Sequence, residues 1–381
     1  MRIGIDARLF GPRTAGGGLG RYIQQLVTEL ENIDDENEYV LFLRKSNWDE
    51  FEETPRFKKV MADYQWYTLE EQIKMPQKVK EAKVDIMHFP HFNVPLAVKV
   101  PFVVTIHDLI LLEHPTQRAS TLGPLKYKLK YAGYKRVISQ ALKRSRAIIV
   151  PSEYTKQSIL KYFPKADESK IKVVYEGLSR LGQEQTPEPE KDMEFLACHN
   201  IKKPFLLYVG NSYPHKNLEA LVRAFQRVLD VKPDCQLVLV GQRNYFSERL
   251  EEETRGLGLR VPEEINFTGY IDDRDLAKLY RSASLYVFPS LSEGFGLPPL
   301  EAMSFGLPVA SSNASCLPEV LGGAAIYFNP KDTQEIANVI LEGLDNNNLR
   351  STLTQAARLQ IQKYSWKKMA KDILEIYKKS V

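Results

Sequence analysis

Short apolar runs alternate with longer amphipathic stretches along the first half of the chain. The runs rich in β-branched and aromatic residues predict buried strands at 2–7, 39–43, 84–89, 102–106, 147–150 and 171–174. Helical periodicity predicts helices between several of them, at 21–30, 69–80 and 124–143. This alternation indicates an α/β fold with a doubly wound parallel sheet, in which ligands bind beyond the carboxyl ends of the strands.

The same alternation returns in the second half, after a change in composition. Strands are expected at 205–210, 236–241, 265–269 and 284–288, with helices at 217–228, 298–305, 333–344, 349–363 and 366–379. The stretch before them is polar and contains prolines, which is typical of a linker. We therefore expect a first domain at 1–180, a linker at 181–203, a second domain at 204–363, and a C-terminal helix at 364–381 that returns to the first domain.

Composition narrows the class of protein. A length of 381 residues favours two domains, and 26% charged with 43% hydrophobic residues is ordinary for a globular protein. A net charge of +4 argues against nucleic acid, and the three cysteines lack the spacing of a disulfide framework or a zinc site. Met1 leads directly into a strand without a signal peptide, so we expect a cytoplasmic protein.

The stretch 286–301 carries the strongest chemical signal in the chain. A short apolar strand ends near Pro289, and a loop with Gly294 and Gly296 follows it. Pro298 and Pro299 suit the first turn of a helix, where an N–H would be unpaired. A strand, a glycine loop and a helix N-terminus in succession predict an anion-binding site.

Two carboxylates extend this prediction. Glu293 lies in the loop and Glu301 is expected in the first turn of the following helix, so they can bind two parts of one elongated ligand. Carboxylates accept hydrogen bonds from vicinal hydroxyls, which suits a ribose and a hexose. The alternative is that both are ordinary acids favoured by the helix dipole.

The sequence Pro-Ser-Leu-Ser-Glu-Gly-Phe-Gly-Leu-Pro-Pro-Leu-Glu-Ala-Met, which places seven residues between Glu293 and Glu301, resembles retaining family-4 (group 1) glycosyltransferases. The resemblance implies the GT-B fold, with two Rossmann-like domains facing across a cleft and a nucleotide-sugar held mainly by the second. It also implies that Glu301 binds the ribose and Glu293 positions the sugar. The loop residues Gly294, Phe295, Gly296 and Leu297 would bind the diphosphate.

A second motif of the same resemblance lies in 205–217. Lys216 stands at a predicted helix start, where a bound anion explains a cation better than helix propensity does. The resemblance makes Lys216 a diphosphate ligand and Asn211 part of the same loop. Many members carry an arginine there, so Asn211 and His215 leave less positive charge on the phosphates. The loop of Gly269, Tyr270 and Ile271 would contact the base through its backbone.

The first half offers looser candidates. Glycines at 16–18 and 20 precede a helix, but they lack the position and spacing of a dinucleotide fingerprint. The resemblance assigns Gly16 and Gly17 to the donor phosphates or the acceptor; a plain glycine-rich turn is the alternative. It assigns His107, just beyond a strand, to the donor sugar. Asp108 beside it is more simply a helix cap.

The segment 118–146 is strongly basic. It holds nine Lys or Arg residues, with tyrosines between them, and no acid occurs between Glu113 and Glu153. One interpretation is a surface at Lys126–Arg146 for anionic lipid or a lipid-diphosphate acceptor. A solvated helix face is the other interpretation, and nucleic acid is a weaker third.

Together these features predict a retaining glycosyltransferase that transfers a hexose to a glycan or lipid-linked acceptor. Similarity to bacterial mannosyltransferases favours GDP-mannose as donor, with a UDP-hexose second. No cofactor is expected, and the absence of an Asp-x-Asp motif near the site predicts metal-independent transfer. The alternatives are a sugar-nucleotide 2-epimerase of the same fold and a degenerate binding subunit.

Overall fold

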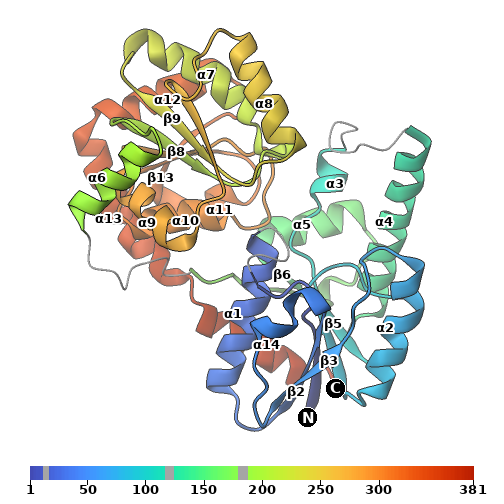
Figure 1. The fold of residues 1–381 in the computed structure, drawn as a ribbon. Helices are drawn as coiled ribbons and strands as arrows, with labels where there is room; N and C mark the ends of the chain where they lie inside the picture. The colour runs from blue at the N-terminus through green and yellow to red at the C-terminus, as the bar shows by residue number, and fades with distance from the viewer. Residues whose placement is uncertain (12–16, 116–123, 179–187) are drawn as a thin grey trace. The chain divides into compact units, whose positions relative to one another are not determined.

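The computed structural model describes residues 1–11, 17–115, 124–178 and 188–381. The chain divides into two compact units (Figure 1). The first contains Met1–Leu112, Ser120–Gly177 and Ser365–Val381, and the second contains Glu113–Ala119 and Leu178–Tyr364. The C-terminal segment therefore belongs to the same unit as the N-terminus.

A fully parallel sheet of seven strands forms the first unit, in the order β3-β2-β1-β4-β5-β6-β7. Its inner strands β1, β2, β4, β5 and β6 are apolar runs buried on both faces, as parallel sheets require, whereas the edge strands β3 and β7 contain exposed residues. They are β1 Arg2–Asp6, β2 Glu38–Leu43, β3 Phe57–Met61, β4 Ile86–Phe89, β5 Phe102–Thr105, β6 Ala147–Val150 and β7 Ile171–Val173.

Helices cover both faces of this sheet (Figure 1). They are α1 Gly18–Ile33, α2 Leu69–Glu81, α3 Ile110–Glu113, α4 Pro124–Arg144, α5 Glu153–Tyr162 and α14 Trp366–Lys378. On one face α1 packs against α14, and on the other α2 and α4 bury Met75, Val79, Ile138 and Leu142 in a single core.

The second unit repeats the design with six parallel strands in the order β10-β9-β8-β11-β12-β13. The strands are β8 Phe205–Val209, β9 Gln236–Val240, β10 Ile265–Gly269, β11 Leu285–Phe288, β12 Val309–Ser312 and β13 Ala325–Phe328. The expected pair of parallel, Rossmann-like sheets is thus confirmed.

Eight helices surround this sheet within the described residues. They are α6 Pro189–Cys198, α7 Leu218–Val231, α8 Tyr245–Gly256, α9 Asp273–Ser282, α10 Leu297–Ser304, α11 Leu317–Leu321, α12 Thr333–Asp345 and α13 Asn347–Gln360. Helices α7 and α12 pack against each other, and α6 packs on α9.

Strand β3 and helix α6 are among the elements that were not expected from the sequence. Strand β3 lies at the edge of its sheet, and its central lysines at 58 and 59 hide the apolar pattern. Helix α6 occupies part of the stretch read as a linker. It begins at Pro189 and buries Phe195 and Leu196, so this part of the stretch belongs to the core of the second unit.

A buried polar network holds α14 against the first sheet. His88 at the middle of the sheet contacts the Tyr377 hydroxyl through Nδ1 at 2.6 Å and the Thr105 hydroxyl through Nε2 at 2.8 Å. The start of α14 lies so close to Gly177 that a Cβ there would come within 2.1 Å of the Trp366 nitrogen. Burial, with a smaller contribution from His107, lowers the pKa of His88 to about 3.

We expect the stability of the first unit to fall as the pH drops below about 6.5. His88 stays neutral in the folded protein but is protonated with an ordinary pKa near 6.5 in the unfolded chain, so acid favours unfolding by up to about 1.4 kcal/mol per pH unit. The variant His88→Gln should lose less stability than the wild type between pH 7 and pH 5, as measured by thermal unfolding. Tyr377→Phe, which keeps the imidazole, should retain the wild-type pH dependence.

Candidate active site

The strand order of the second sheet decides where its loops gather. Strands β8 and β11 are neighbours, and the chain crosses to opposite sides of the sheet after them. Such a switch point leaves a crevice at the carboxyl ends of the strands, where ligands bind in open α/β sheets. The loops that follow β8 and β11 contain Lys216 and Glu293, so the sheet brings together residues that are far apart in sequence.

Lys216 and Glu293 form an ion pair across this switch point. Lys216 Nζ lies 2.6 Å from Glu293 Oε1, and the two side chains are only 13% and 10% exposed. The ammonium group also lies 5.6 Å from the centre of the Phe288 ring. The proposed phosphate ligand and the proposed sugar ligand are therefore in direct contact with each other.

The histidine beside the lysine is held neutral. Burial, followed by repulsion from Lys216, lowers the pKa of His215 to about 4. Its backbone carbonyl accepts a hydrogen bond from the Leu291 N–H at 2.7 Å, which joins the loop after β8 to the loop after β11. At neutral pH this loop thus brings one cation, Lys216, to the pair.

Two residues after β12 hold the 293–296 loop in place, and the sequence analysis did not identify them. The Ser315 hydroxyl accepts the Glu293 N–H at 3.0 Å. The Cys316 thiol lies 3.3 Å from the carbonyl oxygens of both Glu293 and Phe295, where it can donate its hydrogen. Cys316 is fully buried, and burial raises the pKa of its thiol well above the usual value. It is therefore a structural thiol rather than a reactive one.

Helix α10 begins directly after this loop. Its N-cap is Gly296, at a φ of 93°, and no side chain caps the helix. A Cβ at Gly296 would lie 2.9 Å from Leu317, so both the backbone and the packing require glycine. Because Pro298 and Pro299 have no N–H, an anion here depends on the backbone of the loop residues, including Gly294 and Leu297.

Glu301 lies one full turn into α10 rather than at its start. Its side chain is buried, and Oε2 accepts a hydrogen bond from the Tyr280 hydroxyl at 3.2 Å. The Tyr280 ring in turn stacks on Phe305, with ring centres 5.4 Å apart. A tyrosine on α9 thus fixes the orientation of this carboxylate.

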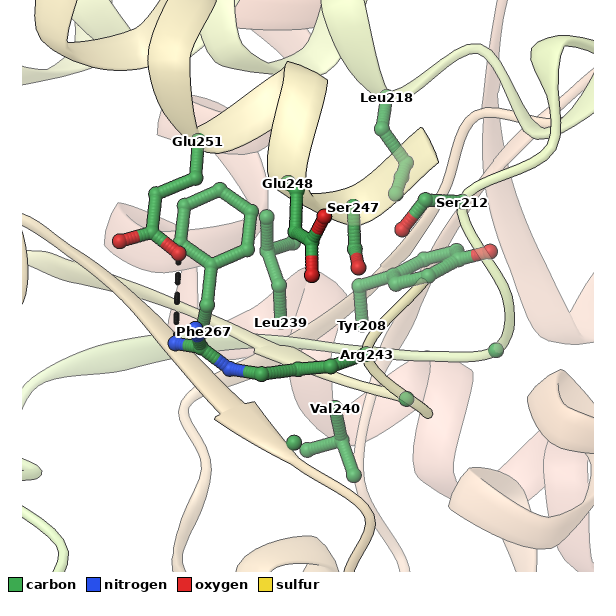
Figure 2. A pocket seen from close by; sticks show the side chains of 13 residues that line it. Tyr208, Ser212, Leu218, Leu239, Val240, Arg243, Ser247, Glu248, Glu251 and Phe267 are labelled. Carbon is green, nitrogen blue, oxygen red and sulfur yellow. Dashed lines mark ion pairs between the residues drawn. The ribbon is translucent and has the colours of Figure 1, made fainter. Parts of the chain in front are cut away.

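A pocket opens at the carboxyl ends of β8, β9 and β10 (Figure 2). Gly269, at the end of β10, lines it at a φ of 78°, and Tyr270 beyond it is 61% exposed. Ile271 is buried. Asn211 lies beside the pocket wall, where its carbonyl accepts the Tyr208 hydroxyl at 2.8 Å.

In the first unit, both ring nitrogens of His107 have partners. Nδ1 lies 3.1 Å from Glu176 Oε1, and Nε2 lies 3.0 Å from the Pro90 carbonyl oxygen. The edge of the Tyr22 ring packs 4.7 Å from the imidazole. Asp108 accepts the Ile110 N–H at 3.0 Å, which is the capping role expected for it. An exchange of one of the His107 contacts would be needed before the ring could donate to a sugar.

A buried ionic cluster at the switch point of the first sheet was also not anticipated. Arg8 follows β1, and its guanidinium binds Asp6 and Glu71, each at 2.7 Å. Asn93, after β4, donates to both Glu71 oxygens at 2.9 Å. Burial alone would lower the pKa of Arg8, but Asp6 and Glu71 outweigh it and raise the value.

The remaining predicted site residues lie at the start of α1. Gly17 is its N-cap, at a φ of 123°, and nothing approaches the position of its missing Cβ within 4 Å. Gly16 lies outside the described residues. Across the residues that are described, no group of three or more His, Cys, Asp or Glu side chains is placed to hold a metal ion.

The two parallel-sheet, Rossmann-like domains give the chain an α/β fold of the GT-B type. Two family models match the chain in order. Residues 16–179 match the model "Glycosyltransferase Family 4", and residues 194–360 match "Glycosyl transferases group 1". The chain belongs to the glycosyltransferases that combine these two domains.

Relatives and solved structures agree with this assignment. The chain is 28% identical to O-antigen chain mannosyltransferase B of Escherichia coli, over 79% of this chain and 76% of that protein. It is 31% identical to the serotype-specific mannosyltransferase WbdA of Escherichia coli over 73% of this chain, but it spans only 33% of WbdA. The structure of Anabaena Alr3699/HepE in complex with UDP and glucose superposes with a TM-score of 0.75 at 18% identity, covering all of both chains.

Loss of the Cys316 thiol should loosen the loop that carries Glu293 and Phe295. We expect Cys316→Ala to weaken the binding of nucleoside diphosphate roughly two- to tenfold, the usual range for one hydrogen bond. Cys316→Ser, which keeps a donor at the same place, should bind more tightly than Cys316→Ala. Isothermal titration calorimetry on both variants makes the comparison, and equal affinities in the two would contradict the positioning role.

Proposed function

We propose that this protein is a retaining hexosyltransferase whose donor is GDP-mannose, with a UDP-hexose as the second choice, and whose acceptor is a glycan or a lipid-linked glycan. The observation that carries the proposal is the Lys216–Glu293 ion pair beside the uncapped helix α10, at the switch point of the second sheet. The names of the mannosyltransferase relatives favour mannose, and the UDP in the HepE structure favours a nucleotide-linked donor.

The diphosphate of the donor would lie at the N-terminus of α10. The helix dipole, the backbone of the 294–297 loop and Lys216 can together stabilise the charge that develops on the leaving nucleoside diphosphate. When phosphate oxygens bind Lys216, the ion pair between Lys216 and Glu293 weakens. Its carboxylate can then accept hydrogen bonds from the hydroxyls of the transferred sugar.

The other end of the donor would extend toward the pocket. Glu301, oriented by Tyr280, would accept hydrogen bonds from the ribose hydroxyls. The base would enter the pocket that Gly269 lines, with Tyr270 and Ile271 beside it. His107 is proposed to act on the transferred sugar.

For the reaction itself, we propose attack on the same face as the departing diphosphate. The acceptor hydroxyl would bond to the anomeric carbon as the bond from that carbon to the phosphate oxygen breaks. A phosphate oxygen would take the acceptor proton, so the sugar keeps its anomeric configuration. The protein supplies orientation and charge stabilisation to this step and requires no metal.

Two substitutions test the donor site. Glu301→Ala should mainly weaken donor binding, whereas Lys216→Ala should also lower the turnover number because the leaving group loses its cation. Steady-state kinetics with GDP-mannose and UDP-hexoses in parallel, followed by mass analysis of the products, measures both effects. Turnover unchanged in both variants would contradict the site.

The same assay separates the alternatives. A rearranged sugar released without any acceptor would identify a 2-epimerase instead. A purified protein that shifts its unfolding temperature with none of GDP, UDP or ADP would indicate a binding subunit that has lost the donor site, because a ligand at a hundred times its dissociation constant adds about 2.7 kcal/mol.

We further propose that α4 makes a peripheral contact with anionic membranes through the Lys126–Arg146 region. Its described basic residues Lys135, Arg136, Lys143 and Arg144 are all exposed, and Lys135 lies 5.2 Å from the Tyr131 ring centre. No helix in the described part of the chain is long and apolar enough to cross a membrane.

Vesicle binding tests this contact. The protein should sediment with anionic vesicles at low salt and not with zwitterionic ones, and reversing Lys135 and Arg136 to Glu should weaken binding about tenfold or more. The double variant Lys202→Glu, Lys203→Glu changes the net charge equally at an exposed site in the second unit, and it should bind like the wild type. Indifference of the wild type to anionic vesicles would refute the contact.

A further inference from the structure

The pocket at the ends of β8–β10 has an apolar body and a polar edge (Figure 2). Leu218, Leu239 and Phe267 contribute its apolar lining, and Arg243, Glu248 and Glu251 its charged side chains. A flat heterocycle with hydrogen-bonding groups on one edge matches this combination.

The polar edge is unsuited to phosphate. Helix α8 begins beside the pocket, but Asn244 caps it by accepting the Phe246 and Ser247 N–H groups at 2.9 and 3.2 Å. The Ser247 hydroxyl in turn accepts the Asn244 N–H at 2.8 Å. The helix N-terminus is thus occupied, and the Glu248 carboxylate near it repels an anion. Hydrogen-bond donors of a neutral group are better ligands for this edge.

The charged residues at the edge differ in how many of their hydrogen-bonding groups remain available to a ligand. Glu251 is paired with Arg243 at 3.3 Å and with Arg255 at 3.0 Å, so its charge is compensated. Arg243 still has N–H donors besides those that face Glu251. Among the described residues Glu248 has no ion-pair partner, and Figure 2 shows its carboxylate directed into the pocket.

We propose that Glu248 selects guanine as the base of the donor by accepting hydrogen bonds from its N1–H and 2-amino group, while Arg243 donates to its O6 and N7 edge. This inference rests on the proposed function, in which the pocket holds the nucleotide base. It adds to that function a residue that decides between nucleotides.

The edges of the bases explain the selection. Guanine presents two parallel N–H donors that one carboxylate can accept together, beside acceptors that suit an arginine. Uracil has a single N–H between two carbonyls, so a carboxylate facing it meets at least one acceptor. Adenine presents an acceptor at N1 where guanine has a donor. Hypoxanthine keeps N1–H but lacks the 2-amino group, which makes its nucleotide the most discriminating probe.

Calorimetric titration of GDP, IDP, UDP and ADP tests the proposal on the full-length protein. The wild type should bind GDP most tightly and IDP about tenfold more weakly, since one good base contact contributes that much discrimination. Glu248→Gln, which places an amide N–H₂ against the donors of guanine, should bind GDP about tenfold more weakly and reduce the difference between GDP and IDP. Glu252→Gln is the matched control, because Glu252 is exposed on the same helix and outside the pocket lining, and it should bind like the wild type.

The outcomes separate this inference from the function on which it rests. If the wild type prefers GDP and both Glu248→Gln and Glu248→Ala keep the same ratio of GDP to IDP affinity, guanine selection by Glu248 is overturned while the GDP donor stands. If the wild type prefers UDP or ADP, the guanine inference and the choice of GDP-mannose are both wrong, but nucleotide-dependent transfer survives. If no nucleotide binds, the donor site itself is refuted, and the inference with it.

Discussion

The ion pair between Lys216 and Glu293 is the interaction on which the proposed donor site depends. Removing two charges from water costs desolvation free energy. Here the opposite charge 2.6 Å away offsets that cost for each of them. The strand order makes the pair, since β8 and β11 lie side by side although 77 residues separate the two charges. A bound diphosphate can therefore replace Glu293 as the partner of Lys216 only if other groups, such as the hydroxyls of the sugar, donate hydrogen bonds to the Glu293 carboxylate. In the proposed function, the pair would couple recognition of the two halves of a sugar diphosphate.

The loop around this pair is held in shape by hydrogen bonds from the neighbouring 313–316 turn. Ser315 accepts the Glu293 N–H, and Cys316 lies against the Glu293 and Phe295 carbonyls, so the 313–316 turn fixes how the peptide units of the anion loop face. Ser315 itself has a φ of 55°, an uncommon conformation for a residue other than glycine. The loop is thus preorganised at some cost in backbone strain, as electrostatic stabilisation of a leaving group requires.

Local signals made most elements predictable. Continuous apolar runs identified most of the strands. Ser152 and Asp272, residue types that favour N-cap positions, cap α5 and α9. The edge strand β3 and helix α6 were not predicted, because lysines and prolines interrupt their apolar patterns. The site residues in the loops could be proposed from the resemblance. The order of the strands determines three further features: the Lys216–Glu293 contact, the hydrogen bonds of Cys316 to the loop, and the position of Glu248 in the pocket. No local pattern carries that information.

Both sheets place a buried cation at the switch point, and the comparison shows why only one is suited to a ligand. Arg8 is 1% exposed and directs its donors to Asp6, Glu71 and the Tyr64 carbonyl, so few of its five N–H groups remain. Lys216 is 13% exposed, and the described residues give its three N–H donors a single hydrogen-bond acceptor, Glu293. Most N–H groups of Arg8 are used in hydrogen bonds within the fold, so Arg8 stabilises the structure. Lys216 has further N–H donors and can exchange its partner for a ligand. The same position in two similar sheets is therefore structural in the first unit, whereas in the second unit it can serve the proposed donor site.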